Sequence, residues 1–163
     1  MKRVLIGFVA AAALYFLGGL VVRALASDET KIRWRVESMI DGFNRERASP
    51  ILRGFAQEFR DDTSEADREL VHQAVVSLFF RERDPQTKRF LLRAEIDPET
   101  LVVEVSEDGS AATVNGVLTL FERKGELEDV LWSASFEGEL VRGEDGFRFV
   151  RSTHETVGGE RPR

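Results

Sequence analysis

The sequence predicts an α+β domain in which three helices pack on one face of an antiparallel sheet of about five strands, preceded by one membrane-spanning helix. Three observations lead to this prediction. Residues 4–22 carry no charged side chain, residues 28–83 repeat apolar side chains at helical spacing, and residues 88–154 alternate apolar and polar side chains as strands do. Helices followed by consecutive strands with short turns are typical of an α+β domain whose helices cover one side of the sheet.

Residues 4–22 form the most apolar stretch of the chain, with Lys2 and Arg3 before it and Arg23 after it. A helix of about nineteen residues rises about 28 Å, close to the ~30 Å hydrocarbon core of a bilayer. The short basic tail in front of it would be hard to translocate, so we expect that tail to stay in the cytoplasm. Residues 1–26 are therefore predicted to be a single-pass anchor in the inner membrane, with the domain on the periplasmic side.

A cleaved signal peptide is the alternative for the same stretch. Residues 24–26 read Ala-Leu-Ala, a signal-peptidase pattern, after which Ser27 would begin the mature, secreted chain. The apolar run is longer than the about 7–15 residues usual in a signal peptide, and Arg23 separates it from the pattern. We favour the anchor on these grounds and leave cleavage after Ala26 open.

The charge of the chain limits its partners. It has 23 basic and 29 acidic residues and a formal net charge of −6, and the acidic excess grows when Lys2, Arg3 and Arg23 are set aside. Nucleic acid would be repelled, and tight docking of the whole domain on an anionic lipid surface is disfavoured. There is no cysteine, which excludes disulfides, thiolate catalysis and cysteine metal sites.

Three helices are expected before the sheet, over residues 28–47, 49–61 and 64–83. The first repeats apolar side chains at helical spacing, and Asp28 is its expected N-cap. Ser64, with Asp67 three residues later, resembles a capping box at the start of the third. Asp84 followed by Pro85 ends that helix.

The second of these helices is the shortest. Ser49 followed by Pro50 favours a helix start, with serine as N-cap and proline at the first helical position. Its apolar face would consist of Ile51, Leu52, Phe55 and Phe59.

Alternation predicts five strands over residues 90–96, 101–106, 111–123, 130–142 and 147–154. Turn residues separate them, including the hairpin signals Asp108-Gly109 and Asp145-Gly146. The clearest alternation is in residues 130–142, whose inward face would be Trp132, Ala134, Phe136, Gly138 and Leu140. Residues 157–163 are predicted to be a disordered tail.

This order of elements, the two long strands at 111–123 and 130–142, and the closing phrase Asp145-Gly146-Phe147-Arg148-Phe149-Val150 resemble the NTF2-like superfamily. That superfamily includes SnoaL-like cyclases and ketosteroid isomerase. The resemblance covers residues 32–155, within a domain predicted at 27–156. It implies a curved sheet that wraps the helices like a cone, a pocket at the open end, and an outer face that often forms dimers. Residues 60–64 do not predict the short strand that members often have between the second and third helices.

Enzymes that this chain resembles place an Asp or His base and a Tyr or acidic donor in the pocket. No titratable group lies on the expected inward face of residues 130–142, and the only tyrosine is Tyr15 in the apolar run. We therefore assign no catalytic residue; His154 and Glu95 are the candidates for a base. The residues expected to line an apolar ligand pocket are Phe43, Trp132, Phe136 and Leu140.

No metal site or cofactor is predicted, because the two histidines, His72 and His154, show no metal-ligand spacing. The favoured hypothesis is a membrane-tethered, non-catalytic NTF2-like module that binds a small apolar ligand or an envelope protein and could form a homodimer. The alternative is a small isomerase, dehydratase or cyclase that uses the cone pocket.

Overall fold

The computed structural model describes residues 26–124 and 127–159. The predicted anchor at 4–22 lies outside these residues, as do positions 160–163 of the predicted tail. Within the described part of the chain, no helix has the length and apolarity needed to cross a membrane.

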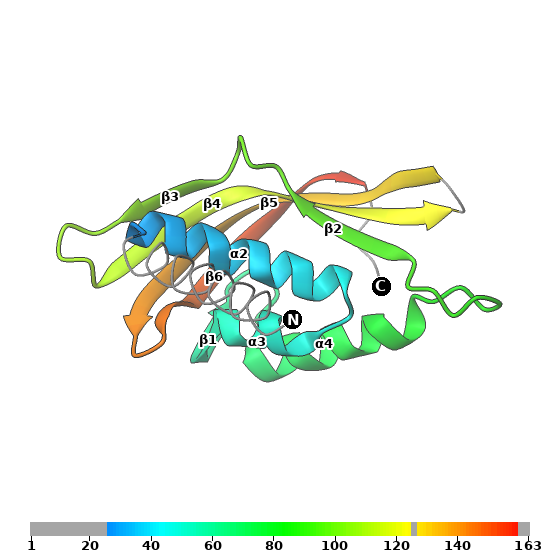
Figure 1. The fold of residues 1–163 in the computed structure, drawn as a ribbon, viewed down its shortest axis with the longest axis horizontal. Helices are drawn as coiled ribbons and strands as arrows, with labels where there is room; N and C mark the ends of the chain where they lie inside the picture. Colours follow the sequence, from blue (N-terminus) through cyan, green and yellow to red (C-terminus); the bar gives the residue numbers. More distant parts are fainter. Residues whose placement is uncertain (1–25, 125–126, 160–163) are drawn as a thin grey trace, which may run out of the picture.

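The described residues form three helices and six strands. In chain order these are α2 (Asp28–Asn44), α3 (Ala48–Gly54), β1 (Phe55–Asp61), α4 (Arg68–Arg81), β2 (Leu92–Ile96), β3 (Val102–Val105), β4 (Ala111–Lys124), β5 (Leu127–Gly143) and β6 (Gly146–Gly159). The α+β class is confirmed, and the three helices lie on one side of the curved sheet (Figure 1).

The sheet is mixed rather than wholly antiparallel, with strand order β1-β6-β5-β4-β2. Strand β1 runs parallel to β6, while β2, β4, β5 and β6 pair antiparallel. Strands β2 and β3 pair with successive halves of β4, since Ile96 lies opposite Leu118 and Val102 opposite Asn115. The predicted meander did not include β1, a parallel partner of β6 that is separated from it in the chain by α4 and four strands.

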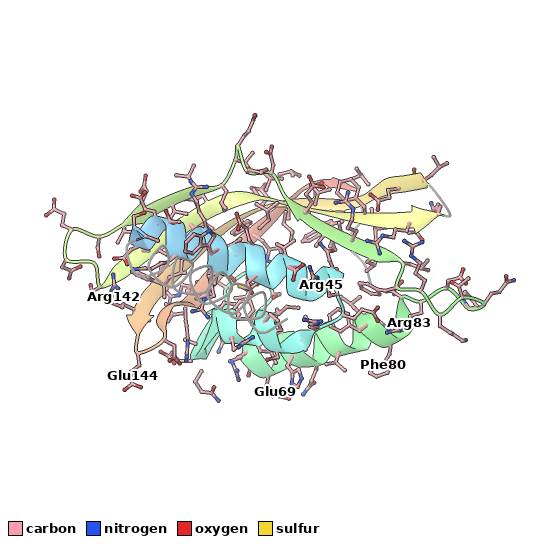
Figure 2. The ribbon with its side chains drawn as sticks, in the orientation of Figure 1. Arg45, Glu69, Phe80, Arg83, Arg142 and Glu144 are labelled. Atoms are coloured by element: carbon pink, nitrogen blue, oxygen red, sulfur yellow. The ribbon has the colours of Figure 1, made fainter. Side chains whose placement is uncertain are left out.

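The inner face of the sheet supplies most of the core. Trp132, Ala134 and Leu140 of β5 are buried, as the alternation predicted. Leu140 packs in one cluster with Ile32, Val114 and Phe149. Trp132 and Ala134 pack in another with Ala94 and Leu120. Phe80, by contrast, is 76% exposed on the outer side of α4 (Figure 2).

The predicted second helix is wrong beyond Gly54, because Phe55–Asp61 is strand β1. A spacing of four residues between Phe55 and Phe59 suits one face of a helix and one face of a strand equally well. The contact that decides is tertiary: the ring of Phe55 lies 4.3 Å from that of Phe59 and 5.9 Å from that of Phe149 on β6. The strand expected of this fold between the second and third helices is therefore present.

Three helix boundaries also differ from prediction. Ser27, not Asp28, caps α2 by accepting the Thr30 amide, and Asp67 caps α4 by accepting the Leu70 amide at 2.8 Å. The N-cap position of α3 is Arg47, which makes no side-chain cap bond. At the other end of the chain, β6 continues past His154 to Gly159, which lies opposite Trp132.

Gly138 marks a close approach between β5 and β6. A Cβ at this position would overlap the ring of Phe149. Gly138→Ala should therefore lower the free energy of unfolding by about 1–3 kcal/mol through overpacking, as measured by urea denaturation. Gly143→Ala on the same strand is the matched control, because its Cβ would meet only the Gly146 carbonyl oxygen at 3.7 Å. Equal effects of the two changes would contradict the close contact with Phe149.

Candidate functional site

A cavity of about 240 Å³ lies between α2 and the inner face of the sheet. Its wall is mostly apolar. The lining residues are Val36, Met39, Ile40, Phe55, Asp61, Ile96, Leu118, Trp132, Ala134, Phe136, Phe149, Ser152, Thr153 and His154. The polar members all come from the end of β1 and from β6, so one side of an apolar chamber carries all of its polar groups.

The pairing of β1 with β6 brings these polar groups together. Asp61 lies opposite Ser152 in the parallel ladder, and the Asp62 amide donates to the Ser152 carbonyl at 2.8 Å. Ser152 and His154 are two residues apart on β6 and therefore face the same side of the sheet. They lie across from Gly138 and Phe136 of β5, whose side is the inner one.

Asp61 is 6% exposed, and its carboxylate is well hydrogen-bonded. Its Oδ1 accepts the Ser64 amide at 2.7 Å and the Ser64 hydroxyl at 2.6 Å. Its Oδ2 accepts the Ser152 hydroxyl at 2.7 Å and lies 3.3 Å from His154 Nδ1. Burial alone would raise the pKa of Asp61, but these hydrogen bonds and the nearby imidazole together hold the pKa below its ordinary 3.8.

His154 is held on several sides. Its backbone amide donates to the Thr63 hydroxyl at 2.9 Å, and that hydroxyl donates to the His154 carbonyl. The ring meets Trp132 edge to face at 6.2 Å between centroids. Trp132 is fixed in turn because its Nε1–H donates to the Thr156 hydroxyl at 3.0 Å.

The arrangement determines which nitrogen of His154 is basic. An ionised carboxylate can only accept, so the contact with Asp61 places a proton on Nδ1. In the neutral ring Nε2 then carries the lone pair, and the described residues offer it no hydrogen-bond partner. A base oriented in this way suits proton transfer in an apolar cavity. Across the same residues, no group of three or more histidine, aspartate or glutamate side chains could hold a metal ion.

The four residues predicted to line one ligand pocket lie in three different places. Trp132 and Phe136 line the cavity. Leu140 is 1% exposed in the core beyond it. Phe43 packs in an aromatic cluster, with ring centroids 5.7 Å from Phe79 and 5.5 Å from Phe90.

Of the two candidate bases, only His154 reaches the cavity. Glu95 lies opposite Thr119 on the outer face of the sheet and pairs with Arg93 at 2.6 Å. The sequence does not predict a site role for Asp61, because the helix expected over residues 49–61 ends there. Reading residues 55–61 as a strand would have identified it. Asp61 is the last residue of that strand that points to the inner face of the sheet.

Solved structures with low sequence identity share this fold. An NTF2-like protein with a cystatin-like fold from Novosphingobium aromaticivorans aligns with a TM-score of 0.62 at 17% identity, over 93% of this chain and 90% of that chain. A protein with a cystatin-like fold from Caulobacter vibrioides aligns with a TM-score of 0.58 at 12% identity, over 81% and 92%. A ketosteroid isomerase-like protein from Erwinia carotovora atroseptica aligns with a TM-score of 0.54 at 11% identity, over 82% and 99%.

These likenesses confirm the NTF2-like fold that the sequence suggested. At such identities they carry no function to this chain. No protein-family model and no curated protein sequence matches it.

Asp61→Asn should lower the free energy of unfolding at pH 7 by about 2 kcal/mol, because charge-assisted hydrogen bonds are lost in a buried place. The folded-state pKa of Asp61 lies below its unfolded value, so its contribution is complete above the ordinary pKa and fades as pH falls through the folded one. The gap between wild type and variant should therefore shrink on acidification below about pH 4. Urea denaturation at several pH values measures this.

The neighbouring Asp62→Asn is the control for that experiment. The Asp62 side chain is 44% exposed and pairs with Arg151 at 3.3 Å, so its loss should cost less than about 1 kcal/mol. A gap for Asp61→Asn that stays constant down to pH 2 would contradict the ionised, hydrogen-bonded carboxylate.

Proposed function

We propose that the cavity binds a small, mostly apolar molecule and that His154, oriented by ionised Asp61, removes a proton from it. The reaction class is that of an isomerase, dehydratase or cyclase. One observation supports this above all: a buried, ionised carboxylate contacts the only imidazole in the wall of an otherwise apolar cavity. A carboxylate and an imidazole add little to apolar packing. Burying them costs free energy that only the hydrogen bonds described above offset.

The proposed step uses the geometry of the pair. His154 Nε2 accepts a proton from a carbon or hydroxyl of the bound molecule, and the imidazolium that forms is stabilised by Asp61 through Nδ1–H. The same nitrogen can return the proton at another position, which would give isomerisation, or to a leaving hydroxyl, which would give dehydration. A positioned base of this kind contributes about 10²–10⁴-fold in rate.

A second candidate keeps the cavity and omits the chemistry. In it the chain is a membrane-tethered module, anchored by residues 4–22, that binds a small apolar ligand or an envelope protein. The observation in its favour is that Asp61 also joins the loop at Ser64 to β6 through Ser152, a structural task that needs no substrate. Dimer formation through the outer sheet face belongs to this candidate as well.

The test begins with the full chain purified from its own host in a neutral detergent. Native mass spectrometry should show an added small mass, and in D₂O that ligand should take up deuterium at one carbon. His154→Gln should retain the ligand and slow deuterium uptake by about 100-fold or more. The other histidine provides the control, since His72 lies on α4 and His72→Gln should leave exchange unchanged.

Two results would favour the second candidate instead. A ligand whose deuterium uptake is the same in wild type and His154→Gln would identify a binding module without catalysis. A chain that carries no ligand but retains a protein partner would point to assembly in the envelope.

A further inference from the structure

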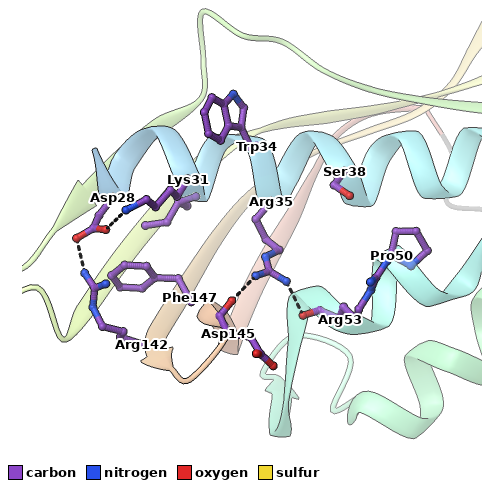
Figure 3. A pocket seen from close by; sticks show the side chains of 12 residues that line it. Asp28, Lys31, Trp34, Arg35, Ser38, Pro50, Arg53, Arg142, Asp145 and Phe147 are labelled. Atoms are coloured by element: carbon purple, nitrogen blue, oxygen red, sulfur yellow. Dashed lines mark hydrogen bonds and ion pairs between the residues drawn. The ribbon is translucent and has the colours of Figure 1, made fainter. Parts of the chain in front are cut away.

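A second hollow, separate from the cavity, lies at the N-terminal end of α2. It is a groove of about 400 Å³ between α2, α3 and the turn that joins β5 to β6 (Figure 3). Phe147 and Ile32 form its apolar floor, and both are nearly buried. Its charged lining residues are the cations Lys31, Arg35, Arg53 and Arg142 and the anions Asp28 and Asp145.

Arg35 lies at the centre of this groove, and the described part of the chain pairs it with no carboxylate. One terminal nitrogen donates to the Arg53 carbonyl at 3.2 Å and the other to the Asp145 carbonyl at 2.9 Å (Figure 3). Carbonyl dipoles hold a guanidinium in place but do not neutralise its charge. Burial, followed by the charges of Arg148 and Arg53, lowers the pKa of Arg35, and Asp145 offsets this only in part.

The two aspartates at the groove are already engaged by other cations. Asp145 accepts from Arg148 at 2.7 Å. Asp28 binds Arg142 and also lies 3.5 Å from Lys31.

Arg53 is exposed, and the described residues include no ion pair or hydrogen bond to its guanidinium. Two carboxylates therefore serve the four cations that line the groove, and one of the two, Asp145, also pairs with Arg148. This occurs in a chain whose net charge is −6. Local positive charge of this kind, surrounded by an acidic surface, is an anion-binding arrangement.

We propose that this groove binds a phosphate group, held between Arg35, Arg53 and Lys31. Guanidinium groups match phosphate oxygens in geometry and bind them with charge-assisted hydrogen bonds. Arg142 is already engaged: its guanidinium lies over the Phe147 ring at 4.5 Å, and its Nε donates to the Gly109 carbonyl at 2.6 Å. It therefore shapes the wall. Arg53 supplies free donors, and Lys31 supplies an ammonium group whose ion pair with Asp28 is long, at 3.5 Å.

The phosphate could belong to a lipid headgroup or to a soluble phosphate. Helix α2 begins at Asp28, five residues after Arg23, which follows the apolar run at 4–22. A membrane anchor in that run would place the groove next to the lipid headgroups. The acidity of the whole domain opposes adsorption on an anionic bilayer, but it does not oppose the binding of a single phosphate in a basic groove.

The test uses the full chain in neutral detergent micelles. Binding is followed by calorimetry, first with inorganic phosphate and then with phosphatidylglycerol added to the micelles. Arg53→Gln should weaken whichever binding is seen by about tenfold, the loss expected for one charge-assisted hydrogen bond. Lys31→Gln should weaken it in the same direction and serves if Arg53→Gln does not fold.

The matched control is Arg45→Gln, which removes the same charge from the other end of α2 (Figure 2). The Arg45 side chain is 61% exposed and pairs with Asp41 at 2.7 Å. Binding of inorganic phosphate that Arg53→Gln weakens and Arg45→Gln does not would assign a soluble phosphate. Binding seen only with phosphatidylglycerol, and with the same selectivity, would assign a lipid headgroup. No binding of either probe, or equal weakening by both variants, would overturn the proposal.

Discussion

The parallel pairing of β1 with β6 is the constraint on which the rest of the structure depends. Without β1, the edge of β6 would be unpaired and the inner face of the sheet would be open beside Phe149. With it, Phe55 and Phe59 cover that face, and the chain can enter α4 only through the turn after Asp61. That turn carries Ser64 and Asp67, so the Asp61 carboxylate and the N-cap of α4 are both fixed by how β1 ends. The sheet edge, the turn and the helix start are thus one cooperative unit.

The two carboxylate oxygens of Asp61 have different roles, one in the stability of the fold and one in the proposed chemistry. Oδ1 accepts both Ser64 bonds and belongs to the turn. Oδ2 accepts from Ser152 and faces His154, so it belongs to the cavity. A buried carboxylate is tolerated only when its lone pairs are satisfied, and here the structural bonds satisfy enough of them to leave the second oxygen beside the imidazole. The feature that makes the fold stable is therefore also the one that would prepare a base.

Long, regular elements could be predicted from the sequence, and short ones that depend on tertiary contact could not. The inward face of β5 was correct because its alternation runs through many residues, and only one sheet face can be buried. Strand β1 was missed because the spacing of Phe55 and Phe59 also fits a helix, and only the contact with Phe149 distinguishes the two. Because β1 was not predicted, Asp61 was missed as well. An aspartate at the end of a helix gives no reason to expect a buried carboxylate. Phe43 was apolar as expected but packs against Phe79 and Phe90, away from the cavity.

Total charge misleads for a similar reason, because it averages over segments that the fold brings together. The cations of the groove come from α2, α3 and the β5–β6 hairpin, and the hairpin is far from both helices in the chain. None of these cations stands out in the sequence. In the fold they outnumber the carboxylates that could neutralise them. The opposite holds at Asp61, which Asp62, Thr63 and Ser64 follow in the polar sequence. In the fold its carboxylate lies in the mostly apolar wall of the cavity. In both places the strength of an electrostatic interaction is set by which charges the fold places within a few ångströms and how far it removes them from water. A residue count contains neither quantity.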